Sequence, residues 1–228
     1  MDILGAALQD YYLNGTAETL WVHNSYGEEE VMPVDLFFRK EKEMPELELK
    51  ALELCKGHVL DIGAGAGSHA LVLQERNFKV TALDISAKAV AIMKQRGVKD
   101  AIEKNIFDLK TANYDTLLFM MNGIGVTGSI SGFKDFLKKA KTYLNPGGQL
   151  IFDSSDISYL YQEIQFPLNA YYGEVAFSYA YKQQRGKWFK WVYIDQQTLQ
   201  NIAKAEGWHC EIIMTDENDQ YLATFIPL

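Results

Sequence analysis

The stretch VLDIGAGAGSHAL (residues 59–71) decides the fold of this chain. The apolar run before the first glycine is typical of a buried strand, and a helical pattern follows the third glycine. Gly63, Gly65 and Gly67 tolerate the dihedrals of a sharp strand-to-helix turn and let a ligand approach the backbone. The helix start offers unpaired N–H groups and the positive end of its dipole. The stretch therefore predicts a strand–turn–helix unit that binds a ligand.

Outward from this turn, predicted strands and helices alternate, which is typical of a parallel sheet in an α/β fold. Strands are expected over 58–62, 79–84, 100–104, 116–121 and 149–153. Helices are expected over 68–76, 86–96 and 132–144, followed near the end by a helix over 195–206. An antiparallel hairpin over 209–215 and 221–227 closes the chain, so seven strands are expected in the main sheet.

Asp84 ends the second predicted strand, 17 residues after Gly67. A carboxylate in this place accepts hydrogen bonds from both hydroxyls of a ribose in dinucleotide-binding folds. An aspartate at a strand end also forms turns, but its place after a glycine-rich unit favours the ribose role.

From Val59 to its C-terminus the chain resembles the class I S-adenosylmethionine (SAM)-dependent methyltransferases of the bacterial small-molecule type. The likeness lies in Asp61 with its three alternating glycines, in Asp84 and in LNPGGQLIF (144–152). It implies a seven-stranded Rossmann-like sheet of order 3-2-1-4-5-7-6, with SAM as cofactor and S-adenosylhomocysteine as product.

The resemblance also implies a set of cofactor-binding residues. The amino-acid end of SAM would lie against Asp61, Gly63, Ala64, Gly65 and Gly67, the ribose on Asp84 and the adenine on Ile85. Where the family usually has an acidic residue after strand three, this chain has Asn105, whose side-chain oxygen can accept the same hydrogen bond. The Ile106 N–H would reach the ring, and Asp108 is the alternative contact. Arg39 would pair with the SAM carboxylate, or else be a surface arginine.

The segment MMNGIGVTG (120–128) follows strand four and should border the transferred methyl group. Met121 is therefore expected to contact the cofactor, and Asn122 to orient an acceptor or to cap the loop. Methyl transfer depends largely on alignment and desolvation, so the reaction demands no universal base. His23 is the histidine expected in a substrate lid, where it would act as base.

We expect one domain with four parts. Residues 1–45 form an N-terminal cap, 46–153 the SAM-binding half, 154–194 an aromatic insertion after strand five, and 195–228 the closing helix and hairpin. The insertion is a predicted β-hairpin of VAFSYAY (175–181) and WFKWVYI (188–194) with its turn at 183–186.

Strand alternation puts the aromatic side chains of this hairpin on a shared face. On the first strand these are Phe177, Tyr179 and Tyr181, and on the second Phe189, Trp191 and Tyr193. Such a face can close over a small acceptor, pack on the core or form a dimer interface. All three roles stay open.

Composition narrows the function classes. With 22 basic and 30 acidic residues the net charge is −8, which argues against nucleic acid as a partner. No apolar run approaches the roughly 20 residues of a membrane span, and the N-terminus lacks the pattern of a signal peptide. Cys55 and Cys210 fit no metal spacing, so we expect reduced thiols, no metal and a cytoplasmic location.

The predicted function is methyl transfer from SAM to a small-molecule acceptor through O, N, S or C, with the oligomeric state open. A protein or RNA acceptor is the main alternative within this activity. An NAD(P)-dependent oxidoreductase is the alternative from another class, although its GxGxxG fingerprint would need glycine where Ser68 stands. A non-catalytic SAM-binding protein is the third.

Overall fold

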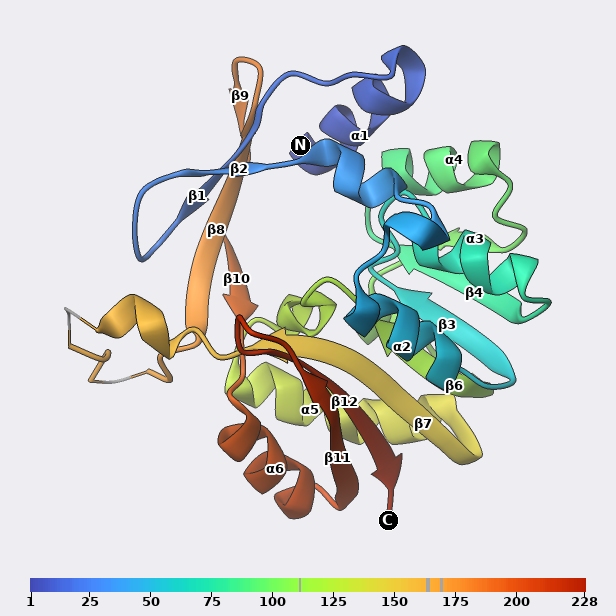
Figure 1. Ribbon diagram of the computed structural model, residues 1–228, viewed down its shortest axis with the longest axis vertical. Coiled ribbons are helices and arrows are strands. Elements are labelled where there is room, and N and C mark those ends of the chain that lie inside the picture. The colour runs from blue at the N-terminus through green and yellow to red at the C-terminus, as the bar shows by residue number, and fades with distance from the viewer. Residues whose placement is uncertain (111, 163–164, 169) are drawn as a thin grey trace.

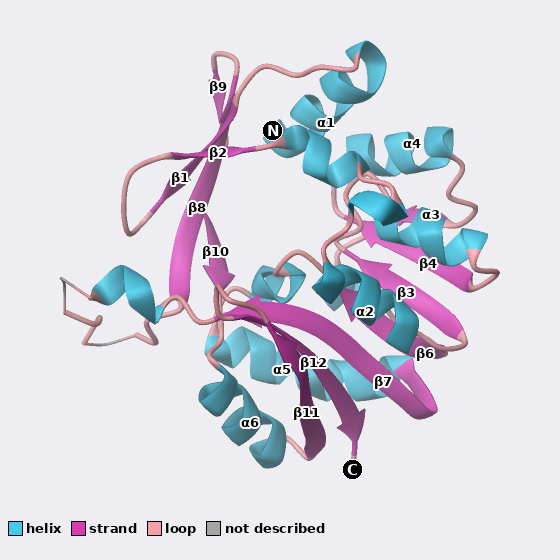
Figure 2. Ribbon diagram, viewed as in Figure 1, coloured by secondary structure: helices cyan, strands magenta, loops and turns pink. Residues whose placement is uncertain are grey.

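The computed structural model describes residues 1–110, 112–162, 165–168 and 170–228. Within them, one sheet has seven strands in the order β11-β12-β7-β6-β3-β4-β5 (Figures 1 and 2). Its strands are β3 (His58–Ile62), β4 (Lys79–Asp84), β5 (Ala101–Glu103), β6 (Tyr114–Phe119), β7 (Leu144–Ser155), β11 (Trp208–Thr215) and β12 (Gln220–Pro227). Strands β3 to β7 are parallel and β12 runs antiparallel to both neighbours. The predicted α/β fold and strand order are confirmed.

Helices cover both faces of this sheet. Alternate residues along each strand point to opposite faces, so they pack into two different cores. Leu60, Leu117 and Phe152 pack against α5 (Ile130–Tyr143) and α6 (Gln196–Ala205). Val59, Leu118 and Ile151 belong to the core on the opposite face. That core holds side chains of α2 (Glu46–Leu54), α3 (Ser68–Glu75) and α4 (Ala87–Arg96). None of the described helices is long and apolar enough to cross a membrane.

A second sheet joins two segments that are far apart in the sequence. Its strands are β1 (Leu20–Asn24), β2 (Glu30–Met32), β8 (Glu174–Tyr181), β9 (Gln184–Arg185) and β10 (Phe189–Val192), ordered β10-β8-β1-β2 with β9 on β8. Strand β1 pairs antiparallel with β8, from Leu20 opposite Tyr181 to Asn24 opposite Phe177. The sheet formed by the predicted insertion is therefore completed by the N-terminal hairpin, which consists of β1 and β2. The turn of the insertion was misplaced, because Gln184 and Arg185 pair with β8 and the chain reverses at Lys182 and Gln183.

The second sheet lies across from the carboxyl ends of the parallel strands. In Figure 1 the arrowheads of β3, β4 and β7 point toward β8 and β10. Helix α1 (Ile3–Asn14) runs beside α4, where the Ser86 hydroxyl donates a 2.5 Å hydrogen bond to Asp2. Short 3-10 helices occupy Val34–Phe38 (η1), Glu41–Glu43 (η2), Ile106–Asp108 (η3), Gly123–Thr127 (η4) and Ser158–Tyr161 (η5). The division of the chain at residues 45, 153 and 194 stays a prediction.

Candidate cofactor and acceptor site

The glycine-rich turn links β3 to α3 and is bound to the end of β4. Gly63, Gly65 and Gly67 all have positive φ, at 73°, 56° and 83°. The Gly63 and Ala64 N–H groups donate to the Leu83 carbonyl over 2.8 and 3.1 Å. The turn thus has the left-handed conformations that glycine adopts without strain, as the sequence predicted.

Asp84 holds the turn from the end of β4. Its two carboxylate oxygens accept hydrogen bonds from the Gly65 N–H, at 2.9 Å, and the Ser86 N–H, at 2.8 Å. Burial raises the pKa of Asp84, although both hydrogen bonds oppose the shift. The neighbouring Ile85 side chain is 72% exposed, so a carboxylate and an apolar surface lie together beside the turn.

The next strand end carries the residues expected at the adenine. Asn105 is exposed, and its side-chain oxygen accepts the Phe107 N–H at 3.0 Å. Ile106 is buried within the core that includes Leu83. Because β5 pairs with β4, these residues stand next to Asp84 and Ile85 at one edge of the sheet.

Asp61 is a buried carboxylate directly before the turn. It is 2% exposed, and its Oδ2 has no hydrogen-bond partner among the described residues. Burial raises the pKa of Asp61 to about 6, although the His69 side chain acts in the opposite direction. A buried charged oxygen without a partner is costly, which is expected where a ligand supplies the missing donor.

A buried network lies behind Asp61. Arg39 pairs with Glu48 of α2, and His69 Nε2 lies 2.9 Å from the other Glu48 oxygen. Burial lowers the pKa of His69, but the Glu48 and Asp61 carboxylates outweigh it and raise the value. Arg39 is therefore no surface arginine, and its Nε has no partner among the described residues. Glu48 was missed, because in ELELKALEL it reads as one of three glutamates on an exposed helix face.

A strained turn follows β6. Met121 and Asn122 are non-glycine residues in the left-handed region, with φ of 61° and 55°. The Asn122 N–H donates to Asp153 Oδ2 over 2.8 Å, and the Ser155 hydroxyl donates to the Asn122 side-chain oxygen over 3.0 Å. Backbone strain of this kind is retained where the surroundings hold it and is frequent at functional sites.

Asp153, in β7, is a functional candidate that the sequence analysis missed. Its side chain is fully buried, and Oδ2 also accepts from Gln220 Nε2 at 2.6 Å. The other oxygen, Oδ1, has no partner among the described residues, and burial raises the pKa of Asp153 to about 6. A signal was present, because Asp153 ends a predicted strand just as Asp84 does.

The aromatic face of the second sheet is turned toward these strand ends. The register puts Phe189 opposite Phe177 and Trp191 opposite Val175 on one face, as predicted. Trp191 lies against η4, since a Cβ on Gly125 would be 2.0 Å from its Nε1. Burial and the Asp84 carboxylate raise the pKa of Tyr179 to about 12. The face therefore extends from the neighbourhood of Asp84 to the η4 segment that follows β6.

His23 does not join this arrangement. It alternates in β1 with the buried Val22 and Asn24, so it points away from the aromatic face. Its Nδ1 lies 3.2 Å from Glu29. Strand alternation thus separates His23 from the residues that the structure brings together.

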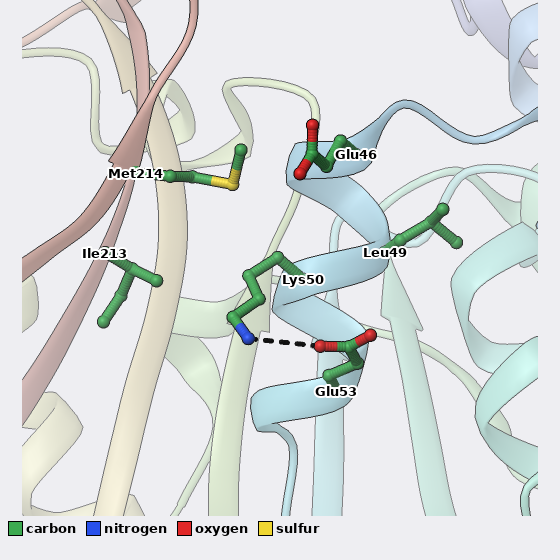
Figure 3. Close-up of a pocket in the computed structure, with 6 residues that line it drawn as sticks. All are labelled: Glu46, Leu49, Lys50, Glu53, Ile213 and Met214. Carbon is green, nitrogen blue, oxygen red and sulfur yellow. Dashed lines mark hydrogen bonds and ion pairs between the residues drawn. The ribbon is translucent and has the colours of Figure 1, made fainter.

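A separate groove lies between α2 and β11 (Figure 3). It is lined by Glu46, Leu49, Lys50, Glu53, Ile213 and Met214. The Lys50 ammonium lies 3.2 Å from Glu53 on the same helix, along the α2 side of the groove. This groove shares no residue with the site.

Comparison with solved structures finds a relative that aligns along the whole of this chain. A SAM-dependent methyltransferase from Bacteroides fragilis, crystallised with S-adenosylhomocysteine, is 42% identical with a TM-score of 0.93. The match covers 100% of this chain and 95% of that one. The sugar N-methyltransferase KedS8 from Streptoalloteichus shares the fold at 14% identity and a TM-score of 0.62, over 89% of this chain and 95% of its own.

Among curated proteins, the ribosomal RNA small subunit methyltransferase C of Aliivibrio salmonicida is 32% identical over 115 residues. That match covers 47% of this chain but only 34% of the relative, so the chain spans about a third of that protein. A family model described as a methyltransferase domain matches residues 37–211. The model spans the glycine-rich turn, Asp84, Asp153 and the aromatic strands, and the chain belongs to this methyltransferase domain family.

Proposed function

We propose that the protein transfers the methyl group of SAM to a small organic acceptor. The observation that carries the proposal is the buried Asp61 Oδ2, which lacks a partner beside a glycine turn with positive φ at all three glycines. The ammonium group of SAM supplies the donor that this oxygen lacks. The relative from Bacteroides fragilis, crystallised with S-adenosylhomocysteine, supports the same cofactor.

The residues of this chain suit each part of SAM. The ribose hydroxyls would bind Asp84, and the sulfur would lie beside Met121. The adenine would contact Ile85, Asn105 and Ile106. The amino-acid end would contact Asp61 and the turn residues Gly63, Ala64, Gly65 and Gly67. When bound, SAM supplies an electrophilic methyl group on a sulfonium. The protein orients the acceptor beside Asn122 and excludes water with the aromatic face.

The aromatic face favours a small acceptor. Tyr179 and Trp191 are partly buried toward the strand ends, so an acceptor reaches the methyl group between them and the turn after β6. The match to a ribosomal RNA methyltransferase raises RNA as a second candidate. The net charge of −8 argues against it, since RNA binding relies on cationic contacts with phosphates.

Thermal unfolding with candidate ligands tests the cofactor. S-adenosylhomocysteine at a hundredfold excess over its Kd should stabilise the fold by about 2.7 kcal/mol and raise the midpoint. NADH at the same concentration should leave the midpoint unchanged. The opposite ranking would replace the methyltransferase proposal with an oxidoreductase.

A further inference from the structure

Asp153 carries a carboxylate oxygen that the described chain leaves without a partner. The Asn122 N–H and the Gln220 side-chain amide occupy Oδ2, while Oδ1 has no donor in a fully buried side chain. An unsatisfied buried acceptor typically costs about 1–3 kcal/mol, and more when it is charged. A ligand with a hydrogen-bond donor would remove that cost.

Tyr193, directly after β10, is acted on electrostatically by Asp153 and by side chains of the second sheet. Burial raises the pKa of Tyr193, and the groups that add most to the shift are Tyr179, Glu30, Tyr159 and Asp153. Glu30 lies opposite Val22 in the register, on the aromatic face, and accepts a 3.3 Å hydrogen bond from the Tyr26 hydroxyl. On the side of α2, Glu48 is the charge acting on Asp153. Arg39 and His69 pair with Glu48, so among the described residues Glu30 is the unneutralised acidic group that remains on the aromatic face.

We infer that the methyl acceptor is a small organic amine, bound with its nitrogen against Asp153 Oδ1 and its carbon skeleton against the aromatic face. This inference rests on the proposed methyl transfer. A neutral amine N–H supplies the donor that Oδ1 lacks, and tyrosine and tryptophan faces stabilise the cationic nitrogen that methylation produces. A carboxylate or phosphate acceptor would meet repulsion from Asp153 and Glu30.

The same geometry accounts for the proton released in the reaction. The neutral amine forms a nitrogen–carbon bond with the methyl group through its lone pair, while the carbon–sulfur bond breaks and its electron pair stays on sulfur. The methylated nitrogen is then an ammonium, and its proton passes to Asp153 Oδ1. Asp153 thus orients the acceptor and takes up its proton.

Calorimetric titration of the complex with S-adenosylhomocysteine tests the acceptor class without requiring turnover. The probes form two series, each with an amine, an alcohol and a carboxylate on the same carbon skeleton. The first is phenethylamine, phenethyl alcohol and phenylacetate. The second is cyclohexylmethylamine, cyclohexylmethanol and cyclohexanecarboxylate. We expect an amine of the panel to bind about tenfold more tightly than its alcohol, the size of one hydrogen bond to a charged group. The carboxylates should not bind.

Three variants locate the effect: a test variant, its matched control and a substitute for the test variant. Asp153→Asn should reduce amine affinity to that of the alcohol and leave the Kd of S-adenosylhomocysteine unchanged. Asp135→Asn, on the exposed side of α5, is the matched control and should keep wild-type amine affinity. If Asp153→Asn fails to fold, Glu30→Gln replaces it as the test of the inference. Glu30 is exposed, and the loss of its charge should weaken binding of the amine but not of the alcohol.

The outcomes separate the two proposals. Wild-type protein that binds no S-adenosylhomocysteine would contradict the methyltransferase function itself. Cofactor binding with no amine bound at millimolar concentration, or with alcohols or carboxylates preferred, would overturn the amine inference alone. Unchanged amine affinity in Asp153→Asn, or in Glu30→Gln where that variant decides, would overturn it as well.

Discussion

Three carboxylates lie at or near the carboxyl ends of parallel strands of the main sheet. They are Asp61 in β3, Asp84 in β4 and Asp153 in β7. Ligands of open α/β sheets bind beyond the carboxyl ends of the strands. Burial raises the pKa of each one. Such costly groups are retained where their charge is used on a ligand.

The ribose role of Asp84 predicts a loss of cofactor affinity. Asp84→Ala should weaken S-adenosylhomocysteine at least about tenfold, because a hydrogen bond to a charged group contributes roughly 1.5–3 kcal/mol. Isothermal titration calorimetry measures the effect, with Asp135→Ala as control. Unchanged affinity in Asp84→Ala would remove this residue from the site.

The raised pKa values predict how stability depends on pH. Folding raises the pKa of Asp61 and Asp153 from 3.8 to about 6, so between these values the native state binds more protons than the unfolded chain. The contribution of these groups to the free energy of unfolding therefore falls as pH rises from about 4 to 6. Asp153→Asn should stabilise the protein at pH ~7.5 by on the order of 1–3 kcal/mol, with little effect at pH ~4.

Urea denaturation of wild type and Asp153→Asn at both pH values checks this sign. Because the asparagine oxygen still accepts from Asn122 and Gln220, the change removes mainly the buried charge. A variant less stable than wild type at the higher pH would show that Asp153 is stabilising as a charge.

At the scale of elements, glycine is required in the turn for two different reasons, backbone conformation and close packing, which a sequence motif does not distinguish. Gly63 has open space where a Cβ would stand, so only its φ of 73° requires glycine. At Gly67 a Cβ would also lie 2.9 Å from Met93 and Val98, where α3 meets α4. The first glycine serves the turn, and the third also serves helix packing.

Substitution by alanine should separate these roles. Gly63→Ala should cost about 1–2 kcal/mol, the penalty of a left-handed conformation for a residue with a Cβ. Gly67→Ala adds overlap with a packed core and should cost about 1–3 kcal/mol more. Thermal midpoints of the two variants give the comparison. Equal midpoints would mean that α4 yields to the added methyl group.

The main sheet was predictable because its signals are local. Apolar runs, glycine turns and helix caps such as Ser86 and Asp195 stand next to the elements they define. The second sheet was only half predictable. The pairing of β1 with β8 uses backbone hydrogen bonds between distant segments, which leave no mark in either sequence.

Residues of the candidate site were likewise predictable only where the signal is local in the sequence. Asp61, Asp84 and the glycines were recognisable from spacing along the chain, whereas Glu48 and Asp153 act through neighbours from other elements. His23 was selected by its segment, but its orientation depends on strand alternation within the sheet that forms.

At the scale of the whole molecule, the two sheets divide the work. The main sheet carries the proposed cofactor residues at its strand ends, and the second sheet presents aromatic side chains to them. Trp191 of β10 against Gly125, and the 2.8 Å hydrogen bond from the Ile130 N–H to Glu174 of β8, are direct contacts between the two parts. Acceptor recognition is therefore expected to reside in residues 159–193 and in the N-terminal hairpin.

Replacing Trp191 by alanine should spare the affinity for S-adenosylhomocysteine and reduce methyl transfer to the acceptor. If the ring serves mainly as core, the variant should instead lose about 3–5 kcal/mol of stability. If it belongs to a dimer interface, sedimentation should show a changed mass. Wild-type turnover, midpoint and mass together would show that the aromatic face has no part in acceptor binding.

A crystal structure of the protein with S-adenosylhomocysteine tests the central claim most directly. The account predicts the ribose hydroxyls on Asp84, the amino group within hydrogen-bond distance of Asp61 Oδ2, and the sulfur facing Met121, Asn122 and Trp191. Ligand bound elsewhere, or a sulfur turned away from the aromatic face, would contradict methyl transfer at the meeting of the two sheets.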